Sequence, residues 1–223
     1  MTNVKKIIPE KIIAQNRLAW NKMPSQDMHA DTNLIRCRKY FLGESKNKRL
    51  LDIGFGEGAN LLYFATEGFD CFGTEIAGNR LKLVQNKFKK TGKKAMLKLV
   101  DSNSLPFADN FFDAIVAWQS IFYNDKKGYQ KILAEIFRTL KPGGSFLCST
   151  VSNQHAVCAK KIAANLYSPG VDSQRTCFVY AFKNKKQVKE MFKKFSNLKI
   201  GFSKSLLFED FEFYYIIRGR KPL

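Results

Sequence analysis

Short apolar runs alternate with amphipathic stretches along the middle of the chain. The apolar runs predict strands at 49–53, 70–75, 95–100, 113–118 and 145–150. Between them, apolar residues recur at helical spacing, which predicts helices from the first strand to Gly68, at 79–91 and at 127–140. The last helix runs into Lys141-Pro142-Gly143-Gly144, a sequence typical of a helix end. Strands alternating with helices predict a parallel sheet with right-handed crossovers.

The two ends of the chain follow other patterns. Residues 9–22 predict a helix whose apolar face includes Asn16, and Asp31 is the expected N-cap of a second helix that ends at Gly43. Residues 151–182 show no clear period. A helix is expected at 184–196, and the β-rich runs 198–205 and 211–218 predict an antiparallel hairpin.

The segment from Leu50 to Asn60 carries the strongest chemical signal. An apolar strand leads into Asp52, and glycines at 54, 56 and 58 then open a helix. Glycine permits a tight turn and removes Cβ atoms, so a ligand can lie on the main chain near the free N–H groups of the helix. The spacing with Ala59, and an acidic Glu75 further on, also fits a dinucleotide loop. Asp52 would repel a pyrophosphate and suits a cationic sulfonium and ammonium group instead, as in S-adenosylmethionine.

Three further segments follow in order. Glu75 ends the apolar run Cys71–Thr74, Asp101 and Ser102 follow the third predicted strand, and Phe111–Trp118 precedes the helix that ends at Lys141–Gly144. With these segments the chain resembles the class I S-adenosylmethionine-dependent methyltransferases, closely so over residues 48 to 150. The resemblance implies an α/β fold with a Rossmann-like seven-stranded sheet of order 3-2-1-4-5-7-6. It further implies an antiparallel strand seven, helices on both faces and an N-terminal helical cap.

The resemblance also implies a site, with S-adenosylmethionine as cofactor and S-adenosylhomocysteine as product. Ribose hydroxyls would bind Glu75, the adenine would lie near Asp101, and the methionine part would lie near Asp52 and the end of strand four. The full cofactor-binding set is Asp52, Gly54, Phe55, Gly56, Gly58, Asn60, Glu75, Ile76, Asp101, Ser102, Asn103, Trp118, Gln119 and Trp20. The cap would add Met28 and His29 as contacts. Plain packing is the alternative role for Trp118, Ile76 and each cap residue.

The sulfonium is already an activated methyl donor, so positioning accounts for most of the chemistry. A hydroxyl acceptor would need a general base, and the catalytic candidates are His155 and Tyr123, with Asp125 beside them. The alternative for His155 is a surface position without a catalytic role. The sequence Trp118-Gln119-Ser120-Ile121 replaces the Asn/Asp-Pro-Pro-Tyr/Phe signature of amino-methylating relatives, which disfavours DNA adenine or glutamine methylation.

Length and composition agree with one domain of 223 residues. Its expected parts are a helical cap at 1–43, a cofactor-binding core at 44–150, a variable substrate or lid segment at 151–182, and a closing helix and hairpin at 183–223. Five cysteines without a C-x-x-C pair read as reduced thiols, no metal site is expected, and without a signal or membrane-spanning segment we expect a cytoplasmic protein.

The formal charge of +19 is high, and a solvated lysine-rich surface is its simplest explanation. The sequence therefore predicts a methyltransferase that acts by in-line displacement on a small molecule, a metabolite or glycan precursor, anionic ones included. Methylation of RNA or protein, which the charge would favour, is one alternative. A nicotinamide-dependent oxidoreductase is the other. Oligomeric state stays open.

Overall fold

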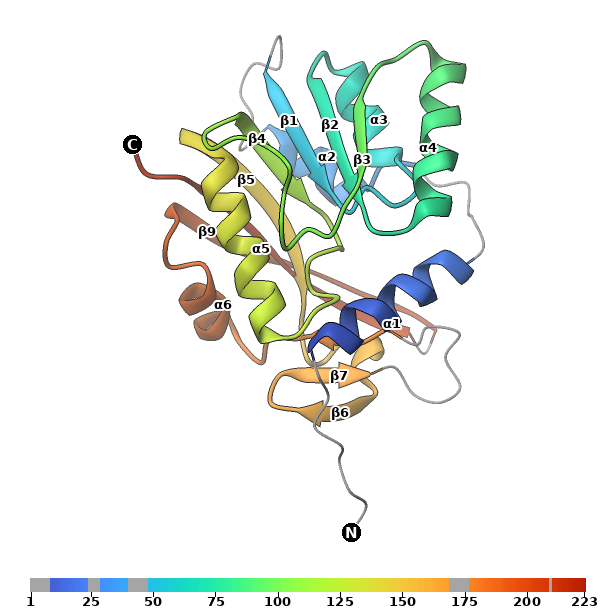
Figure 1. Ribbon diagram of the computed structural model, residues 1–223. Coiled ribbons are helices and arrows are strands. Elements are labelled where there is room, and N and C mark those ends of the chain that lie inside the picture. The colour runs from blue at the N-terminus through green and yellow to red at the C-terminus, as the bar shows by residue number, and fades with distance from the viewer. Residues whose placement is uncertain (1–8, 24–28, 40–47, 169–176, 209) are drawn as a thin grey trace.

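The computed structural model describes residues 9–23, 29–39, 48–168, 177–208 and 210–223. Its centre is a seven-stranded sheet of order β3-β2-β1-β4-β5-β10-β9 (Figure 1). The strands of this sheet are β1 (Arg49–Ile53), β2 (Asp70–Glu75), β3 (Met96–Leu99), β4 (Phe112–Ala117), β5 (Leu140–Val151), β9 (Ser196–Leu207) and β10 (Asp210–Arg220). The first five pair in parallel, and β10 pairs antiparallel with both β5 and β9. The predicted sheet order and the antiparallel seventh strand are confirmed.

Helices cover both faces of the sheet (Figure 1). They are α1 (Pro9–Lys22), α2 (Thr32–Arg38), α3 (Ala59–Thr66), α4 (Gly78–Thr91), α5 (Lys126–Thr139) and α6 (Lys185–Met191). Successive residues of a strand point to opposite faces. Leu51 and Ile53 of β1 accordingly join the apolar cluster under α5 and α6, while Leu50 joins the cluster under α2, α3 and α4. Burial on both faces explains why these strands read as continuous apolar runs.

Three boundaries differ from the sequence prediction by about five residues, more than any of the others. Helix α5 ends at Thr139, and β5 begins at the next residue, Leu140, which pairs with Phe112. The stretch that follows is irregular, with Gly143 at φ +73° and a register shift near Ala114, and it still belongs to the strand. The predicted helix 184–196 ends at Met191, since the chain turns there into β9. Helix α2 ends at Arg38 rather than at Gly43, which lies outside the described residues.

Residues 151–182 contain structure that has no sequence period. A short 3₁₀ helix, Ala156–Cys158, precedes a three-stranded antiparallel sheet of order β6-β7-β8, made by Lys160–Ala163, Leu166–Ser168 and Val179–Tyr180. This small sheet is tied to the carboxyl edge of the large one. Tyr180 N donates to Phe122 O over 2.7 Å, and Phe182 N donates to Val151 O over 3.0 Å.

Helix α1 crosses the carboxyl edge of the parallel strands (Figure 1). Asn16 lies near its middle, and the Asn16 amide donates to Tyr123 O and Phe178 O while its oxygen accepts from Phe178 N. The other end reaches α4, where Asn79 Nδ2 donates to Asn21 O over 3.1 Å. Helix α1 therefore lies over the edge where strands β1, β2 and β4 end.

Candidate functional site

The glycine loop follows β1 and turns back beneath β2. Gly54 N donates to Thr74 O over 2.8 Å, and Gly54, Gly56 and Gly58 have φ angles of +71°, +52° and +75°. L-residues rarely adopt such angles, which explains the choice of glycine. A Cβ placed on Gly56 would meet no atom within 4 Å, whereas one on Gly58 would lie 2.6 Å from Val84 Cγ1. The loop is therefore closed against the protein at Gly58 and open at Gly56, where a ligand can approach the main chain.

Two carboxylates frame this opening. Asp52 is buried at the end of β1, and its Oδ2 has no hydrogen-bond partner among the described residues. Burial first, and the negative charge of Glu75 second, raise the pKa of Asp52 from 3.8 to about 7. Two buried acids that repel each other favour a cationic ligand, because a positive charge would stabilise both.

Glu75 is held by main-chain N–H groups. Its Oε1 accepts from Ile76 N and Ala77 N, and its Oε2 accepts from Gly56 N over 2.9 Å. Burial raises the pKa of Glu75, while these N–H groups counteract the shift. A carboxylate offers about four acceptor positions, so this fixed side chain retains capacity for a further donor such as a hydroxyl.

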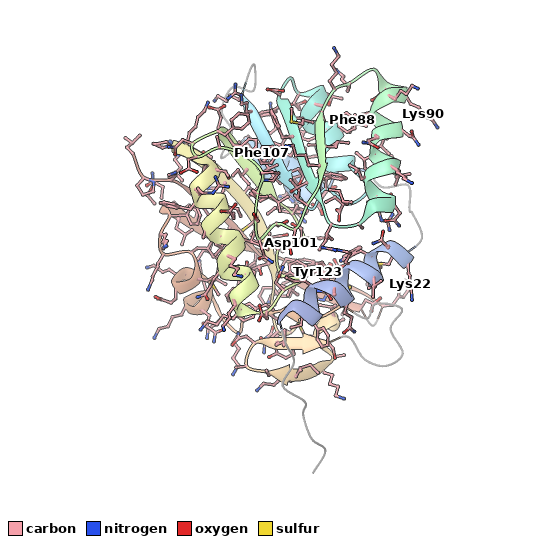
Figure 2. All side chains as sticks on the ribbon, viewed as in Figure 1. Lys22, Phe88, Lys90, Asp101, Phe107 and Tyr123 are labelled. Atoms are coloured by element: carbon pink, nitrogen blue, oxygen red, sulfur yellow. The ribbon has the colours of Figure 1, made fainter. Side chains whose placement is uncertain are left out.

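The residues expected at the adenine follow β3. Val100 N donates to Glu75 O over 2.9 Å, which places this loop beside Glu75. Asp101 Oδ1 accepts from Asn103 N, and Asn103 Oδ1 is buried without a hydrogen-bond partner among the described residues. Asp101, Ser102 and Asn103 are all half-buried. Figure 2 shows Asp101 between the parallel strands and α1, so the structure brings this predicted segment to the same edge as the glycine loop.

The exit of β4 forms the other wall. Ser120 Oγ donates to Ile53 O over 2.6 Å, and Gln119, at φ +50°, donates its N–H to Ser149 Oγ. Trp118 is buried in the cluster beneath α2–α4, as the packing alternative expects, yet its Nε1 has no partner among the described residues. A buried indole N–H normally finds an acceptor. Asp52 Oδ2, Asn103 Oδ1 and Trp118 Nε1 are thus buried polar atoms without a hydrogen-bond partner among the described residues. Together they fit a polar, cationic nucleoside such as S-adenosylmethionine.

The remaining predicted residues are distributed around this edge. Asn60 Oδ1 accepts from Asp31 N over 2.9 Å and so joins α3 to the cap of α2. Trp20 of α1 packs edge-on against Tyr123 at 5.1 Å between ring centroids. Asp125 caps α5 by accepting from Gly128 N. His29 is exposed, and Met28 lies outside the described residues.

His155 is buried, so the alternative that it lies on the surface is wrong. Its Nδ1 accepts from Val157 N over 3.0 Å, which caps the 3₁₀ helix and leaves the ring proton on Nε2 when the imidazole is neutral. The ring packs edge-on against Tyr214 at 4.7 Å. Phe122 links this pair to Tyr123, since its ring centroid lies 6.2 Å from that of Tyr214 and 4.5 Å from that of Tyr123.

Sequence reasoning missed two features that hold the cap. Arg80 and Glu57 form a buried ion pair between α4 and the glycine loop, and Arg80 also donates to Met23 O at the end of α1. The three hydrogen bonds of Asn16 are the second feature. A polar residue within the apolar face of helix 9–22 is the signal that marks Asn16, because a buried amide needs partners.

Comparison with known proteins identifies the class. Residues 50–144 match the family described as "Methyltransferase domain". A sterol 4-C-methyltransferase of Caenorhabditis elegans is 37% identical over 105 residues, which are 46% of this chain and 31% of that protein. A demethylmenaquinone methyltransferase of Thermus thermophilus is 31% identical over 103 residues, 45% of this chain and 46% of that protein. The chain thus spans less than half the length of these relatives.

Solved structures agree on the fold. A SAM-dependent methyltransferase of Methanosarcina mazei superposes with a TM-score of 0.70 at 20% identity, over 88% of this chain and all of that one. The phosphoethanolamine N-methyltransferase 2 of Haemonchus contortus, solved with S-adenosyl-L-methionine, gives 0.68 at 18% identity, over 95% of this chain and 57% of that one. The sheet order, the glycine loop and the family match over residues 50–144 agree on a class I methyltransferase domain, and this agreement supports S-adenosylmethionine over a dinucleotide as the cofactor.

Proposed function

We propose that this chain transfers the methyl group of S-adenosylmethionine to a small organic acceptor at the carboxyl edge of the sheet, beneath α1. The observation that carries the proposal is the buried Asp52 carboxylate, repelled by Glu75 and open at Oδ2 among the described residues. Such a pair is unfavourable alone and favourable around a cation.

Each part of the edge has a task in this proposal. S-adenosylmethionine supplies an activated methyl group on a sulfonium centre. Asp52 attracts the cationic end, Glu75 orients the ribose, and Gly56 admits the ligand to the main chain, with Asp101 to Asn103 at the adenine. Helix α1, held by Asn16, excludes water and holds the acceptor in line, which supplies most of the rate enhancement.

The acceptor side is aromatic. Trp20 with Tyr123, and His155 with Tyr214, come from four different segments near the carboxyl edge. Such surfaces favour an acceptor with a flat or apolar body. The relatives named for sterol and demethylmenaquinone methylation support a small acceptor of this kind. An anionic metabolite or glycan precursor would gain from the +19 charge at longer range.

RNA or protein methylation is the second candidate, and the charge of +19 favours it. A macromolecular acceptor would bind through many phosphate or carboxylate contacts, so its affinity would fall steeply with salt. A small apolar acceptor would show little salt dependence, which separates the two.

A general base is needed only for a hydroxyl acceptor, and His155 and Tyr123 remain the candidates. His155→Asn keeps an acceptor for Val157 N but cannot take up a proton at neutral pH. If His155 is the base, this variant loses the acidic limb of the pH–rate profile, while Tyr123→Phe leaves that limb in place. A reversed result would assign the base to Tyr123.

We further propose one domain, 1–223, with the variable segment 151–182 as the substrate side, and a cytoplasmic location. Among the described helices, none has both the length and the apolar character needed to cross a bilayer.

The first experiment measures S-adenosylhomocysteine binding by titration calorimetry. Wild type should bind with a Kd on the order of micromolar, about 8 kcal/mol. Asp52→Asn should weaken binding at least tenfold, because it removes the charge and keeps the shape. Asp70→Asn, at the exposed start of β2, is the matched control and should bind as wild type. A folded wild type without measurable binding would refute the proposal, and retained binding by Asp52→Asn would refute the role of Asp52.

A further inference from the structure

The sheet has two edges of very different length. β3 is 4 residues long, while β9 is 12 residues long and pairs only with β10 in the described part of the chain. The outer side of a strand presents unpaired N–H and C=O groups, which favour pairing with another strand. β9 also exposes apolar side chains near its end: Phe202 is 66% exposed, Leu206 67%, Leu207 69%, and Phe208, just beyond, 92%.

The beginning of β9 has a different surface. A hollow of about 600 Å³ lies between α6 and β9, and its lining combines apolar Leu198 and Ile200 with Lys185, Lys186, Lys189 and Lys199. The hollow reaches along β9 only as far as Gly201, whereas Leu206 and Leu207 lie at the other end of the strand. The far end carries the opposite charge on the adjoining strand, where Glu212 pairs with Ser205 and Asp210 pairs with Leu207. One end of this hairpin carries exposed apolar side chains with Asp210, Glu212 and Lys204, and the other is an apolar hollow with a basic rim.

A twofold axis brings these two ends together. When two copies of a strand pair antiparallel, the start of each lies beside the end of the other, so one contact is made twice. With the axis beside Phe202, Leu206 of one copy lies opposite Leu198 of the other, and Ser205 lies opposite Lys199. Residues directly opposite share a face. Because Glu212 pairs with Ser205, Glu212 of one copy lies on the same face as Lys199 of the other, with the strand of Ser205 between them. On the other face, α6 of one copy lies beside the exposed Leu206 of the other.

We propose that β9 is a homodimer interface, in which two copies of this chain pair edge to edge and join their sheets. A second copy fits this edge better than an anionic bilayer does, because Asp210 and Glu212 at the hairpin end would repel anionic headgroups. The net charge of +19 opposes association at long range. That repulsion is screened over about 8 Å at physiological ionic strength, so the local contacts decide.

Sedimentation velocity of the full chain tests the interface. At about 100 µM, well above a micromolar Kd, wild type should sediment as a species of twice the 25.6 kDa chain mass. Leu206→Lys should raise the dimer Kd at least tenfold. Met96→Lys is the matched control, since Met96 is a 51% exposed residue on β3, the other edge strand, and should leave the Kd unchanged. Circular dichroism and thermal unfolding confirm that each variant is folded.

A charge exchange makes the test specific to the register. Lys199→Glu and Glu212→Lys should each raise the dimer Kd several-fold, and the double variant should return it to near the wild-type value. A wild type that stays monomeric, or a dimer indifferent to Leu206→Lys, would overturn the proposal. So would a monomer that co-sediments with vesicles of phosphatidylglycerol and phosphatidylcholine through Leu206, because the edge would then face lipid.

Discussion

Asp52 and Glu75 repel each other from the carboxyl ends of two adjacent parallel strands, β1 and β2. Burial and this repulsion raise the pKa of Asp52 from 3.8 to about 7. A raised folded-state pKa means that the folded protein binds a proton more tightly than the unfolded chain. The contribution of Asp52 to stability is therefore fully present below about pH 3.8 and is lost as pH rises through about 7.

The cofactor-free protein should thus lose stability between about pH 4 and pH 7, by on the order of 4 kcal/mol from this group. Asp52→Asn removes the titration and should flatten this part of the curve, leaving it more stable than wild type at pH 8. Thermal unfolding at several pH values measures the difference. Asp70→Asn should keep the wild-type slope. Equal slopes in Asp52→Asn and wild type would show that Asp52 ionises normally.

Gly56 and Gly58 both have positive φ, but only Gly58 faces a filled space. Alanine at either position should cost about 1–2 kcal/mol for the left-handed backbone. Gly58→Ala should cost about 1–3 kcal/mol more, because its Cβ meets Val84. Urea unfolding measures both. Gly56→Ala should instead lose S-adenosylhomocysteine affinity while staying folded. A Gly56→Ala protein that binds normally would mean that the ligand does not approach this main-chain position.

The Arg80–Glu57 ion pair is buried, so removing Arg80 takes away a compensating charge from Glu57. Arg80→Met should destabilise the protein by about 3–5 kcal/mol and also free Met23 O at the end of α1. The double variant Arg80→Met, Glu57→Leu should recover much of that loss. Denaturant unfolding of the single and double variants tests this, and a double variant no more stable than Arg80→Met would contradict it.

Asn16 and Asn21 lie on the same helix with different burial. Asn16→Ala should destabilise by about 2–4 kcal/mol, because Phe178 N and Tyr123 O lose their buried partner. Asn21 is exposed, and Asn21→Ala should change stability by less than about 0.5 kcal/mol. Amide hydrogen exchange measures how readily α1 opens locally, and we expect faster exchange in α1 for Asn16→Ala alone. Similar exchange in both variants would show that α1 is held by other contacts.

The sequence predicted the structure correctly where the local preference of a residue agrees with the conformation that the fold requires of it. Gly54, Gly56 and Gly58 all adopt the positive φ for which glycine is suited. Asp31 caps a helix, as its side-chain type favours. The strand order was implied by the family resemblance, and the structure confirms it.

Sequence reasoning failed where a distant contact decides. Leu140 looked like the last turn of a helix, and pairing with Phe112 draws it into β5. Strands β6 to β8 are 4 residues or fewer, too short for a periodic signal, and they depend on contacts with Phe122 and Val151. The buried state of His155 depends on Tyr214, which lies far along the chain. None of these partners can be found from the neighbouring residues.

The hydrogen bonds of Asn16 have a consequence for how the chain is made. Asn16 and Phe178 are separated by 162 residues, so α1 cannot complete these contacts until about four fifths of the chain has been made. At a synthesis rate of about 5–20 residues per second, this is a wait of roughly 10–30 s. Helix α1 leaves the ribosome before the other described helices and is therefore among the last of them to reach its place.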